Sequence, residues 1–312
     1  MENTTPLFTV ATITYNSANY IRQAIESVLS SSFKDFEFLI GDDCSVDETW
    51  NIIQEYKDER IKSWRNQANL GEYPNRNEVL KRAEGKFLVI VDGDDILYKN
   101  SLWNLKTYVD YFPDVGMLLG VSQQWFEEIV LPYELSSIDA FKLLYDWECP
   151  MSTIGFGEIV FNVNKLKGIG GFPTLFRTGD LFLKKSMSLK HTVLLIPFGV
   201  VFWRNSPGQA SKKIDLMESF LERKWIDDII LYDQNFIPKE IFFQIKRNVK
   251  ISLLKNLVRE TIFKGNFLIF FKLVIKMKLT CGDLRFLFLS VNRMDTVRKS
   301  KGLLKYNDFN FN

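Results

Sequence analysis

Three aspartates follow an apolar segment directly in the sequence VIVDGDD, residues 89–95. Asp92, Asp94 and Asp95 would repel one another unless a cation or hydrogen-bond donors neutralise them. An Asp-x-Asp pair suits Mg2+ or Mn2+, which takes one or two carboxylates from the protein and further oxygens from substrate phosphates. The simpler alternative is a polar turn in which an aspartate caps a helix. A calcium-binding EF-hand is disfavoured because the glycine is misplaced and no glutamate closes the loop.

Two further polar clusters also end apolar segments. TYNSAN (14–19) follows LFTVATI (7–13), and DDCSVD (42–47) follows FEFLIG (36–41). These segments and KFLVIVD (86–92) are predicted strands, nearly continuous in apolar residues and separated by amphipathic helical patterns. This alternation predicts an α/β fold with a Rossmann-like, mostly parallel sheet flanked by helices. Ligands bind beyond the carboxyl ends of such strands, so the three polar clusters are expected to line one edge.

The helix signals are uneven along the chain. Ser45 and Glu48 have capping-box spacing, which predicts a helix that begins there and runs to about Lys57. Further helices are expected over 101–112 and in GDLFLKKSMSLK (179–190). KLKGIGGFP is expected to form a turn, and the apolar run 191–203 two buried strands. From about 215 the pattern becomes helical and basic.

Charge is distributed unevenly over the 312 residues. The chain carries 40 Lys/Arg against 38 Asp/Glu, but residues 236–312 hold 16 of the basic and only 5 of the acidic residues. An acidic body with a basic tail indicates two roles. We therefore expect a catalytic domain over 1–212 and a basic amphipathic helical region over 213–312.

Compartment signals favour the cytoplasm. Cys44, Cys149 and Cys281 are far apart and form neither a disulfide framework nor a metal-binding pattern. The first ten residues lack the basic and apolar regions of a signal peptide. No uncharged apolar run approaches the ~20 residues that cross a bilayer. The expected location is cytoplasmic, including the cytoplasmic face of the inner membrane.

The order and spacing of these motifs resemble the family 2 glycosyltransferases of GT-A fold. The resemblance runs from TVATITYNSANYIRQAIESVLSSSFKDFEFLIGDDCSVDET through NLGEYPNRNEVLKRAEGKFLVIVDGDD to IGGFP and RTGD, roughly residues 5–212. It implies an inverting, metal-dependent transfer of a sugar from a nucleotide-diphosphate donor, a UDP-sugar, to a saccharide or lipid-linked acceptor. Cell-surface polysaccharide or glycolipid synthesis is the implied setting, and the resemblance does not identify the sugar.

The resemblance also implies a set of donor-binding residues. Tyr15 and Asn16 would lie beside the nucleotide base, where the tyrosine ring offers a stacking face. Asp43 would accept a hydrogen bond from the base, and Arg76 and Asn77 would contact the nucleotide and its phosphates. The alternatives are ordinary ones: a core aromatic, a helix cap and a solvated helix start.

The acidic motif completes the implied donor site. Asp92 would help to hold the ribose, whereas Asp94 and Asp95 would address Mn2+ or Mg2+ and the diphosphate. Asp180, in FRTGD, occupies the place of the family's general base, which removes the proton of the acceptor hydroxyl. The alternative is that Asp180 caps the helix that follows, which a negative charge favours.

Two positions depart from the commonest family pattern. Gly179 stands where a glutamate often precedes the base, and Ser206 stands where a histidine that reaches the metal often follows Arg204. The sole histidine, His191, lies in the apolar run and is assigned a structural role. Metal binding is therefore expected to rest on carboxylates, phosphates and water, and to be weak without the nucleotide.

The basic tail has two interpretations of equal weight. Phe, Leu and Ile alternate with Lys and Arg over IKRNVKISLLKNLVRETIFKGNFLIFFKLVIKMKL, which suits an anionic membrane surface. Alternatively the apolar stripe packs on the catalytic domain and the charges are solvated. Nucleic acid is not an expected partner, since the sequence holds no recognised reading module.

Two other functions compete with the transferase. A nicotinamide-dependent oxidoreductase needs GxGxxG after the first strand, but that turn reads TYNSAN. A non-catalytic sugar-nucleotide-binding partner of a polysaccharide assembly system would keep the fold without the base. The position of Asp180 relative to the nucleotide edge distinguishes the binder from the enzyme.

Overall fold

The computed structural model describes residues 5–122, 129–145, 150–206, 215–232 and 237–289. Its internal contacts divide the chain into two compact units. Unit 1 comprises residues 1–136, 154–174 and 191–207, and unit 2 comprises 137–153, 175–190 and 208–312. The units interleave along the chain, so the predicted functional division at residue 212 stays a prediction.

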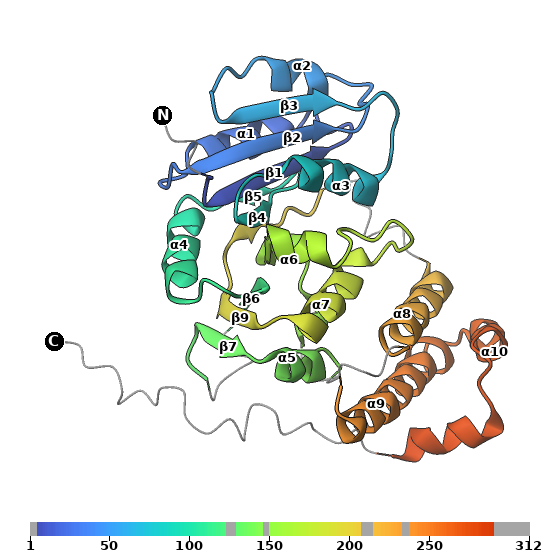
Figure 1. Ribbon diagram of the computed structural model, residues 1–312. Helices are drawn as coiled ribbons and strands as arrows, with labels where there is room; N and C mark the ends of the chain where they lie inside the picture. The colour runs from blue at the N-terminus through green and yellow to red at the C-terminus, as the bar shows by residue number, and fades with distance from the viewer. Residues whose placement is uncertain (1–4, 123–128, 146–149, 207–214, 233–236, 290–312) are drawn as a thin grey trace. The chain divides into compact units, whose positions relative to one another are not determined.

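Unit 1 is built on an eight-stranded sheet (Figure 1) with the order β3-β2-β1-β4-β8-β6-β9-β7. Its strands are β1 Phe8–Thr14, β2 Phe36–Asp42, β3 Ile61–Arg65, β4 Phe87–Ile90, β6 Met117–Val121, β7 Tyr133–Leu135, β8 Ile159–Asn162 and β9 Val193–Pro197. β1, β2, β3 and β4 pair in parallel, as do β6 and β9, whereas β8 and β7 run antiparallel to their neighbours. The prediction of a mostly parallel α/β sheet is confirmed.

A second, two-stranded sheet lies close to the acidic motif in the sequence. β5 (Ile96–Leu97) follows the three aspartates directly and pairs antiparallel with β10 (Val201–Phe202). Leu97 is paired with Val201, and Ile96 with Phe202. This pairing fixes the end of the acidic loop to a segment more than a hundred residues later.

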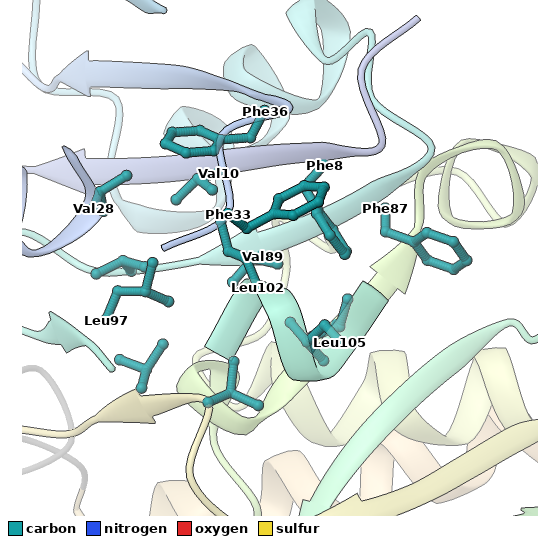
Figure 2. Packing of buried hydrophobic residues seen from close by; sticks show 14 of the residues in the cluster. Phe8, Val10, Val28, Phe33, Phe36, Phe87, Val89, Leu97, Leu102 and Leu105 are labelled. Atoms are coloured by element: carbon teal, nitrogen blue, oxygen red, sulfur yellow. The ribbon is translucent and has the colours of Figure 1, made fainter. Parts of the chain in front are cut away.

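Helices cover both faces of the parallel strands. The helices of unit 1 are α1 Ile21–Leu29, α2 Thr49–Gln54, α3 Glu72–Arg82, α4 Ser101–Tyr111 and α6 Val163–Gly168. Side chains alternate across a strand, so Phe8 and Val10 of β1 point to one face. They join the apolar side of α1, α2 and α4 in one core (Figure 2) that excludes water from Phe36 and Phe87. α3 packs on β1 and β2 without joining that core.

Two local expectations were wrong. The helix predicted from Ser45 begins at Thr49, because the Ser45 hydroxyl bonds to Asp42 and is not available as a cap. Residues 163–168 form α6, where a turn was expected; Asn162 caps this helix by accepting a hydrogen bond from the N–H of Lys165. β7 and the helix after it were not anticipated from the sequence.

Unit 2 is helical. It contains α5 Ser137–Leu144, α7 Gly179–Lys190, α8 Leu216–Ile230, α9 Lys239–Leu257 and α10 Phe267–Lys276. It also contains two 3-10 helices, Pro150–Thr153 and Cys281–Phe288, and a π-helical turn, Val258–Ile262. An apolar cluster gathers Phe141 of α5, Phe176, and Ile226 and Ile245 of α8 and α9. No helix in the described parts of the chain is long and apolar enough to cross a membrane.

Candidate functional site

The loops after β1 and β2 are joined by hydrogen bonds at the carboxyl edge of the sheet. Asn16 has a φ of 51°, and its N–H donates to Ser45 Oγ at 2.9 Å. The Asn16 amide oxygen in turn accepts from the N–H of Val46 at 2.9 Å. Asparagine tolerates this left-handed backbone better than most residues. Asn16 therefore fixes one loop against the other, beside the predicted position of the base.

Asp42 fixes the Ser45 side of this junction. Its side chain is fully buried, accepts from the N–H and hydroxyl of Ser45, and lies 3.3 Å from Arg65 Nε. Burial raises the pKa of Asp42, and the Ser45 hydrogen bonds and the charge of Arg65 oppose that shift. Tyr15, by contrast, is 46% exposed. An exposed ring on a rigid loop is available for stacking against a flat ligand.

Asp43 is buried and organises the loop that leads into α3. Its Oδ1 accepts from the N–H of Leu70 at 2.9 Å and from the Asn66 amide at 2.8 Å. Its Oδ2 accepts from the N–H of Gly71 at 2.8 Å, where a φ of 91° suits glycine. Asp43 thus lies at the carboxyl edge of the sheet, as predicted. Its carboxylate already accepts hydrogen bonds from the backbone N–H groups of residues 70 and 71.

Arg76 and Asp92 form an ion pair between α3 and the end of β4. Arg76 is 3% exposed, and its Nη2 lies 3.0 Å from both Asp92 Oδ2 and Glu72 Oε1. The guanidinium also lies 4.2 Å from the ring centre of Phe156. Arg76 Nη1 and Asp92 Oδ1 are buried with no hydrogen-bond partner among the described residues. Buried polar atoms are normally paired, so these two atoms indicate a place for a polar ligand group.

Asn77 has a different neighbour from the adjacent Arg76. Its amide donates to the carbonyl of Phe172 at 2.8 Å and accepts from the Phe172 N–H at 2.9 Å. A Cβ on Gly171, where φ is 78°, would approach the Asn77 oxygen to 2.7 Å. Asn77 therefore holds the IGGFP turn, and its expected nucleotide contact stays a prediction.

The remaining aspartates are held by a segment that follows β10. The Arg204 N–H donates to Asp95 Oδ1 at 2.9 Å, and Arg204 Nε donates to the carbonyl of Asp94 at 2.8 Å. The Ser206 hydroxyl donates to Asp94 Oδ2, and the Arg204 guanidinium reaches Gln23 at 2.6 Å. Ser206, which departs from the commonest family pattern, contacts the acidic motif directly.

These donors balance part of the negative charge. Arg76 neutralises Asp92, while Asp94 receives hydrogen bonds without a paired cation among the described side chains. Asp95 is 3% exposed, and burial, with the charges of Asp92 and Asp94, raises its pKa to about 7 against the Arg204 hydrogen bond. A cation at this place would favour the ionised form of Asp95.

The donor set fits a hard divalent cation that a ligand helps to hold. Carboxylate oxygens at a strand end are the ligands that Mg2+ and Mn2+ prefer. Within the described residues no group of three or more His, Cys, Asp or Glu side chains could hold a metal alone. Asp94 and Asp95 would therefore supply only part of the coordination, and phosphate oxygens the rest.

Glu158 is a residue whose role the sequence did not reveal. It is 6% exposed, and its carboxylate accepts from the N–H groups of Gly199 and Val200 at 3.0–3.3 Å and of Val201 at 3.4 Å. A Cβ on Gly120 would come within 1.9 Å of a Glu158 oxygen, so glycine is required there. Glu158 thereby fixes the segment that carries β10, Arg204 and the donors to the acidic motif.

Asp180 belongs to unit 2 and lies in the first turn of α7. Its carboxylate is 3.2 Å from Lys184 Nζ, and Lys184 is fully buried and donates to the carbonyl of Ser152 at 2.9 Å. The structure therefore shows a positioned, partly exposed carboxylate, and its role as a base stays a prediction. The sequence offers Glu158 and Asp146 as alternatives to Asp180 for the base; Glu158 is bound by the N–H groups of residues 199–201, and Asp146 lies outside the described residues.

The family match covers the segment of the chain that carries the acidic motif and the loops after β1 and β2. Residues 9–130 match the family model described as Glycosyl transferase family 2. The chain is 34% identical over 133 residues to poly(ribitol-phosphate) beta-N-acetylglucosaminyltransferase TarS of Staphylococcus aureus, a match covering 39% of this chain and 23% of TarS. It is 38% identical over 98 residues to UDP-Glc:alpha-D-GlcNAc-diphosphoundecaprenol beta-1,3-glucosyltransferase WfaP of Escherichia coli, covering 31% and 39%. The matches thus span less than half of either relative.

Solved structures agree on the fold. TarS 1–349 in complex with UDP-GlcNAc superposes with a TM-score of 0.64 at 22% identity, covering 78% of this chain and 72% of that one. The mannosyltransferase PcManGT of Pyrobaculum calidifontis, in complex with GDP-Man and Mn2+, gives a TM-score of 0.59 at 16% identity, covering 95% and 86%. At these identities the likeness shows the GT-A fold alone.

Glu158 yields a test of how this site is held. Burial raises the pKa of Glu158 to about 7 from an ordinary 4.5, against the three backbone N–H groups. The folded protein therefore binds a proton more tightly than the unfolded chain, so stability falls as pH rises from 4.5 to 7 and is constant beyond. Relative to Glu158→Gln, the wild type should lose roughly 3 kcal/mol over that window, measured by urea unfolding.

Other titrating groups, Asp95 included, are common to both proteins and cancel in the difference. Parallel stability curves for the two proteins would show instead that the backbone hydrogen bonds keep Glu158 ionised throughout.

Proposed function

We propose that this chain, whose residues 9–130 match glycosyl transferase family 2, transfers a sugar from a UDP-sugar to a saccharide or lipid-linked acceptor, with inversion at the anomeric carbon. The observation that carries the proposal is the pair of unpartnered buried atoms, Arg76 Nη1 and Asp92 Oδ1, beside the acidic motif. They offer one donor and one acceptor at the carboxyl edge of the sheet. A ribose hydroxyl both donates and accepts, so it can satisfy both groups, whereas a phosphate oxygen only accepts and can satisfy Arg76 Nη1 alone.

The donor is proposed to bind along the edge from β2 to β4. Tyr15 would stack on the base and Asp43 would accept a hydrogen bond from it, on a loop junction that Asn16 makes rigid. Arg76, Asn77 and Asp92 complete the proposed nucleotide contacts. The TarS structure contains UDP-GlcNAc, and the name of WfaP gives UDP-Glc, which supports a UDP-sugar for this chain.

Asp94 and Asp95 are proposed to hold Mn2+ or Mg2+ together with the diphosphate. Such a cation supplies positive charge to the leaving nucleoside diphosphate as its bond to the sugar breaks. The Arg204 N–H binds Asp95 Oδ1 and the Ser206 hydroxyl binds Asp94 Oδ2, so each carboxylate is held through one oxygen and has its second oxygen to offer to the cation.

The acceptor step needs a base that is not part of the donor site. We propose Asp180, which would remove the acceptor hydroxyl's proton as that oxygen bonds to the anomeric carbon and the diphosphate departs. Lys184 fixes the carboxylate from within unit 2. The names of TarS and WfaP give a polymer and a diphosphoundecaprenol acceptor, so a saccharide or lipid-linked acceptor at the cytoplasmic face of the membrane is proposed.

Asp94→Asn tests the donor and metal assignments. In the wild type, UDP should raise the melting temperature more with Mn2+ than with EDTA, since ligand bound only to the folded state stabilises it. Asp94→Asn keeps the shape and the Ser206 contact but removes the charge, so the Mn2+-dependent part of the shift should vanish. Asp110→Asn, which changes an exposed aspartate on α4, should leave the Mn2+-dependent part of the melting-temperature shift unchanged. An undiminished Mn2+ increment in Asp94→Asn would reject the metal assignment.

Asp180→Asn tests the proposed base. The turnover number should fall about 10²–10⁴-fold, which is the usual contribution of a general base, while UDP affinity stays at the wild-type value. Asp228→Asn is a matched control, because Asp228 also pairs with a lysine four positions away on a helix of unit 2. Near-normal transfer by Asp180→Asn would return this residue to a helix-terminal role and favour the non-catalytic sugar-nucleotide binder or another base.

A further inference from the structure

α10 presents a stripe of large apolar side chains to solvent. Phe267, Phe271 and Ile275 recur every four residues, and Leu268 lies between them on the same side of the helix. Their exposed fractions are 56%, 61%, 75% and, for Leu268, 68%. Exposed apolar patches of this kind on a folded surface mark interaction sites.

The opposite side of α10 anchors the helix in unit 2. Leu273 is fully buried and Met277 is 3% exposed, and both pack with Phe220 of α8 and Leu257 of α9. The helix therefore has its own core contacts. The stripe consists of side chains that this core does not use.

Positive charge surrounds the stripe. Residues 263–280 contain four lysines, Lys264, Lys272, Lys276 and Lys278, and no aspartate or glutamate. All four lysines are exposed. A helix with an apolar face and flanking lysines fits the boundary between lipid headgroups and acyl chains, where aromatic rings enter and lysines meet phosphate.

Charge complementarity selects among the occupants of this face. A second copy of the chain would bring two sets of lysines together, and the acid that precedes them, Glu260, is already paired with Lys264 and Arg259. Residues 290–312 carry five Lys/Arg against two Asp/Glu, so this segment is also positive and a poor complement. An anionic lipid surface satisfies both the apolar stripe and the lysines.

We propose that α10 is a membrane-docking helix, which inserts Phe267, Leu268, Phe271 and Ile275 into the interface of an anionic bilayer. This inference builds on the proposed location at the membrane face and is independent of the transfer reaction. The proposed membrane contact is one face of α10 rather than the whole basic tail. The remaining tail charges add attraction without entering the interface.

The full chain should sediment with vesicles of phosphatidylcholine and phosphatidylglycerol, and far less with phosphatidylcholine alone. Binding should weaken with added salt, because the screening length falls from ~10 Å at 0.1 M to ~3 Å at 1 M. Phe267→Ser/Phe271→Ser should reduce vesicle affinity at least about tenfold, since each ring buries apolar area in the interface. Phe243→Ser/Tyr232→Ser changes two other exposed aromatic residues of unit 2 and should bind as the wild type does.

The charge arm uses a second pair of variants. Lys272→Gln/Lys276→Gln should weaken binding about twenty-five-fold, at roughly fivefold per lysine near the surface. Lys57→Gln/Lys99→Gln removes the same charge from exposed sites of unit 1 and should have little effect. Equal losses from the two lysine pairs would show that net charge alone drives binding, and would overturn the assignment to α10.

Circular dichroism and UDP-induced thermal stabilisation, recorded on every variant, separate this inference from the proposed function. Unchanged UDP stabilisation with lost vesicle binding supports a dedicated docking helix. Vesicle binding without any UDP response would reject the donor site and leave the docking helix standing. Wild-type affinity in Phe267→Ser/Phe271→Ser, or wild-type dimers that this variant abolishes without any vesicle binding, would overturn the proposal.

Discussion

Negative charge concentrated at the carboxyl ends of β2 and β4 has to be balanced within a few ångströms, and many hydrogen bonds and ion pairs of unit 1 meet that requirement. Asp42, Asp43 and Asp92 are each met by donors from another segment: Ser45 and Arg65, the 66–71 loop, and Arg76. Removing water from a carboxylate is costly unless such partners replace it. The edge is thus rigid before any ligand arrives, which lowers the entropy lost when a ligand binds.

The acidic motif is balanced differently from the rest of this edge. Asp94 and Asp95 receive hydrogen bonds from Ser206 and Arg204, which orient the two carboxylates but leave most of their charge in place. Burial then raises the pKa of Asp95 to about 7. Fixed carboxylate oxygens that lack a paired cation among the described side chains support the proposed cation site. Where many family members have a histidine after the last strand, this chain uses the hydroxyl of Ser206 against Asp94.

Distant segments make this arrangement possible. Glu158 ties residues 199–201 by their N–H groups, β10 then pairs with β5, and Arg204 and Ser206 follow within five residues. Each link is a backbone or buried contact, so displacement at one link should be transmitted to the next. In unit 2, one face of α10 packs in the apolar core through Leu273 and Met277, and the opposite face takes no part in that core.

The sequence by itself determined the parallel strands and their acidic ends. Continuous apolar segments such as FEFLIG, followed at once by aspartates and separated by helical patterns, are typical of strands buried on both faces of a parallel sheet. The same holds for the basic, helical character of the tail. The conformation of one strand and the loop after it depends mainly on residues that are neighbours in the sequence.

Only the tertiary structure decided which donors meet those aspartates. Ser206 lies 112 positions from Asp94, and Glu158 lies 41 positions from Gly199, so no local period or spacing connects them. Asn77 and Arg76 are adjacent in sequence yet bind different partners, because successive helix residues point in different directions. Ser45 was expected to cap a helix, and the nearby buried Asp42 captured its hydroxyl instead. Long-range packing therefore determines which of several chemically suitable donors and acceptors form hydrogen bonds with one another.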